Sequence, residues 1–152
     1  YWDSLCFNRV IPDFVAQGGC PDTPEGFANS PHLLDPEFHD SLRHVYGAVG
    51  AGRDDNPAMR SAACQFYIVQ GKPMTEAEIS MAEQRLGTKL SPEQKKDYTT
   101  VGGSAWLDGS YTVFGEVVEG LEVIDKIAAV QTGAADRPVT DLRMKMKLIV
   151  KK

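Results

Sequence analysis

One arginine interrupts an apolar strand pattern near the start of the chain. Phe7 and Ile11 fall on one face of the predicted strand, and Arg9 occupies the same alternating phase. A guanidinium is permanently charged and presents a rigid fork of N–H donors. Such a group can stabilise charge that develops during a reaction. The alternative is a structural ion pair, with Asp13 or Asp108 as the partner.

The elements around this strand follow from local signals. Pro12 cannot donate a backbone hydrogen bond and should interrupt the strand. Residues 18–19 are both glycine and permit a turn. Residues 44–52 alternate small and apolar side chains, and residues 64–69 form an apolar strand with one amide, Gln65, inside it. That amide could simply bridge two neighbouring strands.

Helical spacing replaces the strand pattern after residue 75. Thr75 followed by Glu78 is a capping box, and Gly87 is a helix C-cap signal. A second helix should begin with Pro92 at its first position. A short amphipathic helix is predicted over residues 121–127. The last stretch predicts a final strand, because apolar residues alternate along it: Leu142, Met144, Met146, Leu148 and Val150. The other face of this strand would carry basic residues.

Several motifs resemble those of the cyclophilins, the peptidyl-prolyl cis/trans isomerases. Residues 7–19 resemble the family signature F-H-R-V-I-x-x-F-x-x-Q-G-G, with Asn8 in place of the usual histidine. Residues 64–68 resemble S-Q-F-F-I, and residues 106–115 resemble W/H-L-D-G-x-x-x-V-F-G. Residues 44–52 resemble H-x-x-G-x-x-S-M-A, although glycine and alanine replace the Ser-Met pair. Together the motifs look most like those of bacterial members.

The resemblance implies a mainly β fold. We expect a single cyclophilin-like domain over residues 1–152, a closed antiparallel β-barrel with flanking helices. Cyclophilins cross residues 73–103 in a short loop, so the two predicted helices should be a helical-hairpin insertion. It would be either a lid packed over a barrel edge or a partner-binding feature. The family's opening hairpin and first helix have no counterpart here, so we expect those N-terminal strands to precede Tyr1.

The resemblance also implies catalysis of cis/trans isomerisation at X–Pro bonds of peptides and unfolded proteins, which assists folding. The barrier to this rotation is about 18–20 kcal/mol, and no cofactor or metal is needed to lower it. The family match assigns catalysis to Arg9, Gln65 and Phe14. It assigns substrate binding to the remaining matched positions: Val15, Gln17, Tyr67, Trp106, Leu107 and Tyr111.

Two other functions remain as alternatives. A proline-peptide binding module or chaperone would use the same groove with little turnover. A thiol redox protein is disfavoured because the sequence has no Cys-x-x-Cys motif. Beyond proline-containing peptides and unfolded proteins, the resemblance adds cyclosporin-like ligands as a class of partner.

Composition sets the outer limits. The 152 residues are 42% hydrophobic and 24% charged, which suits one globular domain. The net charge of −5 disfavours a nucleic-acid partner. No apolar run approaches the roughly 20 residues of a transmembrane helix, and both the bacterial cytoplasm and the periplasm remain open.

Cysteines and histidines do not form a metal-binding pattern. The three cysteines lack metal-site spacing, and a Cys6–Cys20 disulfide could form in an oxidising compartment. The three histidines, His32, His39 and His44, share no predicted element. We therefore expect no metal site.

Overall fold

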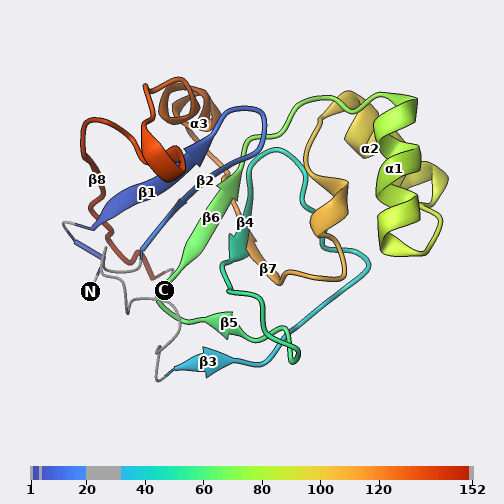
Figure 1. The fold of residues 1–152 in the computed structure, drawn as a ribbon, viewed down its shortest axis with the longest axis horizontal. Helices are drawn as coiled ribbons and strands as arrows, with labels where there is room; N and C mark the ends of the chain where they lie inside the picture. The colour runs from blue at the N-terminus through green and yellow to red at the C-terminus, as the bar shows by residue number, and fades with distance from the viewer. Residues whose placement is uncertain (1, 4, 20–31, 151–152) are drawn as a thin grey trace.

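A six-stranded antiparallel sheet forms the centre of the molecule in the computed structural model, which describes residues 2–3, 5–19 and 32–150 (Figure 1). The strands lie in the order β7-β4-β6-β2-β1-β8. In chain order they are β1 (Cys6–Ile11), β2 (Val15–Gly18), β4 (Ala48–Ala51), β6 (Phe66–Val69), β7 (Val113–Glu116) and β8 (Leu142–Arg143). A separate two-stranded pair joins β3 (Leu33–Leu34) to β5 (Ser61–Ala62).

The sheet is open, so the expected closed barrel is not confirmed. A barrel needs every strand paired on both sides. Within the described part of the chain, β7 and β8 are the two edges, and each pairs on one side only. The antiparallel pairing and the flanking helices agree with the expectation.

The final strand is much shorter than predicted. The alternation over residues 142–150 predicted a long strand, but β8 contains two residues. It pairs with the beginning of β1, and one further backbone hydrogen bond joins the Met144 amide to the Leu5 carbonyl. Beyond that point the partner strand has ended, and Leu148 is 87% exposed. Alternation alone therefore overestimated the strand, because pairing depends on how far its neighbour extends.

The β1–β2 hairpin follows the predicted interruption. Pro12 and Asp13 form the turn, where Asp13 adopts a left-handed φ of 60° and the Phe14 amide donates to the Ile11 carbonyl. The pairing register shifts between Phe7 and Arg9, which marks a bulge. Phe7 lies opposite Gly18 and Arg9 lies opposite Gln17, so these two side chains occupy different faces. The expectation that Phe7 shares a face with Arg9 was wrong, because a bulge shifts the alternation by one residue.

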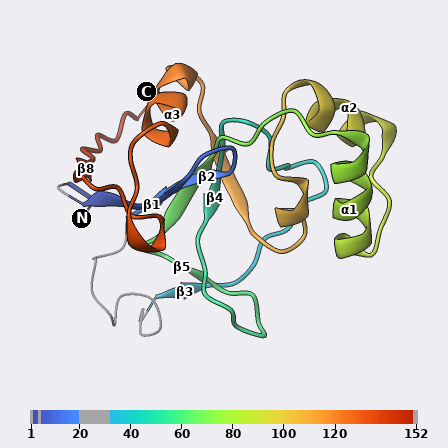
Figure 2. The same cartoon turned by 45° about the horizontal axis from the view of Figure 1, so that its top comes forward.

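The two predicted helices after residue 75 are present as α1 (Glu76–Leu86) and α2 (Pro92–Thr100). The capping box of Thr75 and Glu78, the left-handed Gly87 cap and the N-terminal proline of α2 are all confirmed. The hairpin lies at one end of the molecule, away from α3 (Leu121–Ala128), which packs against β1 and β2 (Figures 1 and 2). That the hairpin is an insertion stays a prediction.

A second apolar core joins this hairpin to the rest of the molecule. It includes residues of the hairpin and of the short 3₁₀-helix η1 (Ala105–Leu107): Met74, Ile79, Ala82, Leu90, Tyr98 and Ala105. Trp106 packs against this core and also against the core on the sheet. The hairpin therefore packs on η1. Its two candidate roles, a lid over a barrel edge or a partner-binding feature, stay predictions.

Glu83 is a buried carboxylate that holds the two helices together. Its side chain is 3% exposed and accepts hydrogen bonds from Lys89 Nζ at 2.8 Å and from the Leu90 amide at 2.9 Å. Lys95 Nζ of α2 lies 2.9 Å from Oε1, the oxygen that also accepts from the Leu90 amide, whereas Lys89 is bound to Oε2. The hydrogen bonds from Lys89 and then Lys95 lower the pKa of Glu83 to about 2.

We expect Glu83 to make the hairpin acid-sensitive. Because its folded-state pKa lies below the ordinary value of 4.5, its stabilisation is present above pH 4.5 and is lost as the pH falls toward 2. Glu83→Gln should lower the melting temperature at pH 7. It should also remove most of the fall in melting temperature that the wild type shows between pH 4.5 and 2. Circular dichroism melts across this range would check this, with exposed Glu119→Gln as the control. Parallel decline in Glu83→Gln and the wild type would contradict it.

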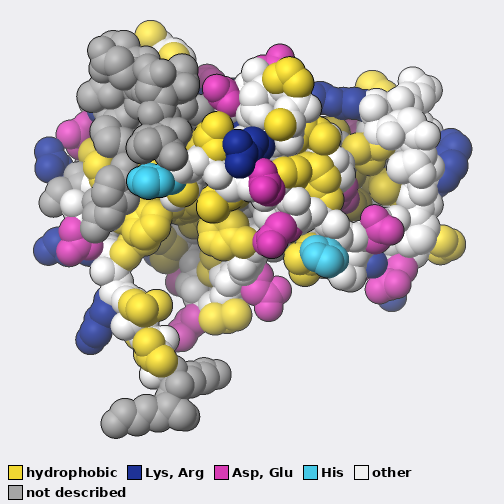
Figure 3. Space-filling model, turned by 90° about the horizontal axis from the view of Figure 1, so that it is seen from below, with side chains coloured by type: hydrophobic (Ala, Val, Ile, Leu, Met, Phe, Trp, Pro, Cys, Tyr) yellow, Lys and Arg dark blue, Asp and Glu magenta, His cyan; other side chains and the backbone are white. Residues whose placement is uncertain are grey.

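The surface carries charges of both signs. On the face nearest the β3–β5 pair, apolar side chains gather near the middle, with acidic and basic side chains interspersed around them (Figure 3). None of the described helices has the length and apolar character that crossing a bilayer would require.

Candidate active site

A row of four residues crosses the sheet and brings the predicted polar and apolar site residues together. Arg9 on β1 lies opposite Gln17 on β2, Gln17 opposite Tyr67 on β6, and Tyr67 opposite Gly50 on β4. Residues directly opposite in antiparallel strands point to the same face. The side chains of Arg9, Gln17 and Tyr67 therefore share one face of the sheet.

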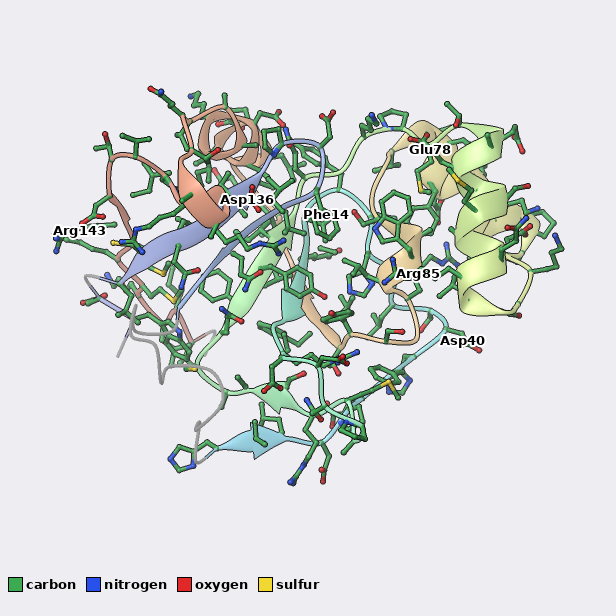
Figure 4. All side chains as sticks on the ribbon, in the orientation of Figure 1. Phe14, Asp40, Glu78, Arg85, Asp136 and Arg143 are labelled. Carbon is green, nitrogen blue, oxygen red and sulfur yellow. The ribbon has the colours of Figure 1, made fainter. Side chains whose placement is uncertain are left out.

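An apolar cluster covers the same face beside this row. Its buried members are Val15, Ala48, Tyr67, Val69, Leu107 and Val113, and Phe14, Trp106 and Tyr111 pack against them half-buried. Phe14 lies where β1 turns into β2 (Figure 4). The rings of Tyr67 and Tyr111 meet edge to face at 6.0 Å. All the residues predicted to hold a proline ring therefore lie in one cluster, although their roles stay predictions.

Gln65 is a buried amide with spare hydrogen-bonding capacity. Its side chain is 5% exposed, and its Oε1 has no hydrogen-bond partner among the described residues. Gly52 makes room for this amide, because a Cβ at that position would lie 2.5 Å from Oε1. The alternative in which Gln65 bridges two strands is wrong for Oε1, since the bond across to Gly52 uses the backbone carbonyl of Gln65 instead.

Arg9 pairs with a carboxylate that the sequence did not indicate. Its Nε lies 3.5 Å from Oδ2 of Asp136, and its side chain stays 43% exposed. Asp136 belongs to the 3₁₀-turn η2 (Ala134–Asp136), which lies beside β1 (Figure 4). The two partners named in the structural alternative were wrong, because Asp13 pairs with Lys72 and Asp108 pairs with His44. Arg9 is thus oriented by Asp136 while remaining accessible to a ligand.

The turn that presents Asp136 is conformationally strained. Ala135 and Asp136 have φ values of 56° and 59°, in the left-handed region. This conformation costs an ordinary residue about 1–2 kcal/mol.

Ala135→Gly should therefore stabilise the protein by about 1 kcal/mol, because glycine adopts a positive φ without that cost. Ala135 is exposed, so no packing is lost. Urea denaturation would measure the change. The matched control is the neighbouring exposed Ala134, which has no positive φ, and Ala134→Gly should destabilise by about 0.5–1 kcal/mol. Changes of the same sign in both variants would contradict the strain argument.

Sequence reasoning missed several polar residues next to the cluster. Arg53 lies over the Tyr111 ring, with its Cζ 4.5 Å from the ring centre, and donates from Nε to the Ser110 carbonyl at 3.0 Å. His44 is 1% exposed and contacts both Tyr67 and Asp108. His44 stands in the family pattern and could have been found there. No sequence signal connects Arg53 to Tyr111.

Groups that could support metal or thiol chemistry are few in the described part of the chain. The described residues contain no group of three acidic, histidine or cysteine side chains placed to hold a metal ion. Cys6 is a half-buried free thiol, so it does not form the bridge considered from the sequence. Its proposed partner, Cys20, lies outside the described residues.

Comparisons with known proteins agree with this geometry. Residues 1–147 match the family model described as cyclophilin type peptidyl-prolyl cis-trans isomerase. A relative from Staphylococcus saprophyticus, named as a peptidyl-prolyl cis-trans isomerase, is 34% identical over 145 residues, which cover 93% of this chain and 70% of the relative. A protein of Streptococcus pyogenes, named as a bifunctional phosphatase/peptidyl-prolyl cis-trans isomerase, is 33% identical over 93% of this chain and 30% of its own length.

Solved structures show the same fold. A cyclophilin type peptidyl-prolyl cis-trans isomerase of Cryptosporidium parvum, crystallised in the presence of the dipeptide Ala-Pro, superposes with a TM-score of 0.66 at 16% identity. The match covers 100% of this chain and 78% of that one. The resemblance seen in the motifs is confirmed, and the chain belongs to the cyclophilin-type peptidyl-prolyl cis-trans isomerase family.

Proposed function

We propose that this chain isomerises X–Pro bonds with Arg9 as the donor and the cluster around Tyr67 as the proline pocket. The observation that carries the proposal is the row across the sheet. It sets a half-exposed guanidinium beside a buried apolar cluster on the same face. Isomerisation needs both features, a dry site for the ring and a donor at its edge.

Rotation about the prolyl bond breaks no covalent bond, so catalysis consists of stabilising the twisted state. In that state the amide loses its resonance and the prolyl nitrogen regains a lone pair. A cation fixed near this nitrogen and the adjoining carbonyl stabilises the twisted state more than the planar ground states. Arg9 can supply this stabilisation, since Asp136 orients it from one side and the guanidinium stays accessible from the other.

The other polar residues have separate roles in this proposal. The buried Oε1 of Gln65, which no described residue donates to, is an acceptor for a backbone N–H of the bound peptide. Gln17 lies opposite Arg9 and limits the directions in which its side chain can point. Trp106 and Tyr111 pack half-buried on the cluster and form the rim of the pocket.

The substrates are proline-containing peptides and, by extension, exposed prolines of unfolded chains. The Ala-Pro dipeptide present with the Cryptosporidium parvum relative supports the choice of ligand. Uncatalysed isomerisation takes tens to hundreds of seconds and can limit folding. Acceleration of this step would assist protein folding. Cyclosporin-like ligands, which the family resemblance adds, would compete for the same pocket.

NMR exchange spectroscopy on a short Ala-Pro-containing peptide would test the function. Catalysis predicts cis–trans exchange far above the spontaneous rate at substoichiometric protein. The competing function, a proline-peptide binding module, predicts shifted peptide signals with an unchanged exchange rate. That second outcome would remove the isomerase proposal and leave the binding module in its place.

A further inference from the structure

A continuous line of hydrogen bonds runs beneath the proposed proline pocket and into the helical hairpin. Tyr67 Oη lies 2.8 Å from Nε2 of His44, and Nδ1 of His44 lies 2.8 Å from Oδ1 of Asp108. Tyr98 of α2 donates from its hydroxyl to Oδ2 of Asp108 at 2.5 Å. The four side chains range from fully buried to partly buried, and His44 and Tyr98 are almost completely enclosed.

The chemistry of the carboxylate sets the direction of these bonds. An ionised carboxylate only accepts hydrogen bonds, and Asp108 accepts from Tyr98, from the His44 amide at 3.0 Å and from the His44 ring. Nδ1 of His44 therefore carries a proton toward Asp108. This leaves Nε2 as the acceptor for the Tyr67 hydroxyl. Burial raises the pKa of Tyr67 above its ordinary value of 10, so its hydroxyl keeps the proton that it donates.

The backbone beneath Tyr67 is shaped for this arrangement. A Cβ placed on Gly50 would overlap the Cζ and hydroxyl of Tyr67, so the ring occupies the space that a side chain at position 50 would need. The rings of Tyr67 and His44 also stack, with centres 5.9 Å apart. The orientation of Tyr67 is thus fixed by a missing side chain on one side and a hydrogen bond at its tip.

We propose that His44, Asp108 and Tyr98 are positioning residues that set the Tyr67 ring in the proline pocket and link the helical hairpin to it. The inference rests on the proposed function, because it assumes that Tyr67 contacts the substrate. Asp108 also directly follows Leu107, another member of the apolar cluster. A shift of the carboxylate would therefore displace two walls of the pocket together.

This arrangement gives the hairpin a role inside the domain. Tyr98 belongs to α2 and not to the sheet. Its hydroxyl nevertheless forms the last bond of the line that begins at Tyr67. The Tyr98 hydroxyl also approaches the His44 amide at 3.1 Å. Removal of the Tyr98 hydroxyl should therefore change the KM for a peptide at the proposed pocket.

Tyr98→Phe tests this link, with Tyr46→Phe as the matched control. Tyr46 also loses a hydroxyl that makes two bonds, to the Leu121 carbonyl at 2.9 Å and to Asp125 at 3.0 Å, but it lies outside the apolar cluster. We expect Tyr98→Phe to raise KM for an Ala-Pro peptide about fivefold, which is the effect of one lost hydrogen bond of about 1 kcal/mol. Tyr46→Phe should leave KM unchanged.

Two further measurements separate positioning from general stability. In the Tyr67→Phe variant the line is already cut, so adding Tyr98→Phe should raise KM no further. Nitrogen NMR of His44 should show the proton on Nδ1 in the wild type, and a changed Nε2 signal in Tyr67→Phe. Additive effects on KM in the double variant, or a proton on Nε2 of His44 in the wild type, would overturn the proposal.

The test also distinguishes this inference from the proposed function. If the wild type does not isomerise the peptide, the proposed function fails, and the same variants are compared by the dissociation constant of the peptide and by the Tyr67 ring signals. A Tyr67 ring signal that moves in Tyr98→Phe and not in Tyr46→Phe would then still support the link. Equal ring signals in all variants would overturn it.

Discussion

Replacement of Arg9 by alanine should lower kcat/KM for X–Pro isomerisation by a factor of about 10²–10³, the effect of removing one preorganised donor from a transition state. The loss should appear mainly in kcat, because the apolar cluster that we propose as the proline pocket stays intact. The fold should remain, since the Arg9 side chain is 43% exposed and, among the residues that the structure describes, its ion pair is with Asp136 alone. NMR exchange on the Ala-Pro peptide would measure the effect.

Two variants make this result specific. Arg143→Ala removes a cation from β8 of the same sheet, where it pairs with Asp141, and should leave the rate unchanged. Arg9→Lys keeps the charge and loses the planar fork of donors, so it should give an intermediate rate. If Arg9→Ala retains more than about a tenth of the wild-type rate, Arg9 is not the main donor.

The second large effect is expected from Gly50→Ala. A Cβ at this position overlaps the Tyr67 ring, so the ring must leave its place beneath the pocket. Overpacking of a buried site costs about 1–3 kcal/mol. The displaced ring also loses its bond to His44. We expect a lower melting temperature together with a large rise in KM for the peptide.

Gly115→Ala is the control for this substitution. Gly115 lies on the neighbouring strand β7, and a Cβ there meets only Val49, at an ordinary contact distance of 3.7 Å. Gly115→Ala should therefore change neither stability nor KM appreciably. If Gly50→Ala behaves like the wild type, the Tyr67 ring has another position that serves equally well. The claim that Gly50 fixes the position of this ring would then be wrong.

Local features of this fold could be predicted from the sequence. The capping box at Thr75, the cap at Gly87 and the start of α2 at Pro92 depend on residues within one helical turn. The cluster of pocket residues followed from motifs, since each motif fixes one strand or turn of a known arrangement. Local sequence signals therefore predicted the helix ends, and the family motifs predicted which residues gather at the candidate site.

Features that depend on distant partners could not be predicted. The length of β8 depends on where β1 begins, and the openness of the sheet depends on which strands find a neighbour. Arg9 pairs with Asp136, which is far away in the chain and sits on a strained turn that no motif marks. The link from Tyr67 to Tyr98 joins four residues from separate parts of the fold, and only their packing reveals it.

Trp106 gives the molecule a single cooperative unit where two might have been expected. Its indole packs against the core on the sheet and against the core of the α1–α2 hairpin. Neither core can loosen without uncovering the same side chain, so their unfolding free energies are not independent. A chimera that replaces the hairpin with another loop would remove the packing that the hairpin core provides to this indole. The hairpin thus helps to hold Trp106 against the apolar cluster on the sheet. Replacement of the hairpin would require a compensating change at Trp106.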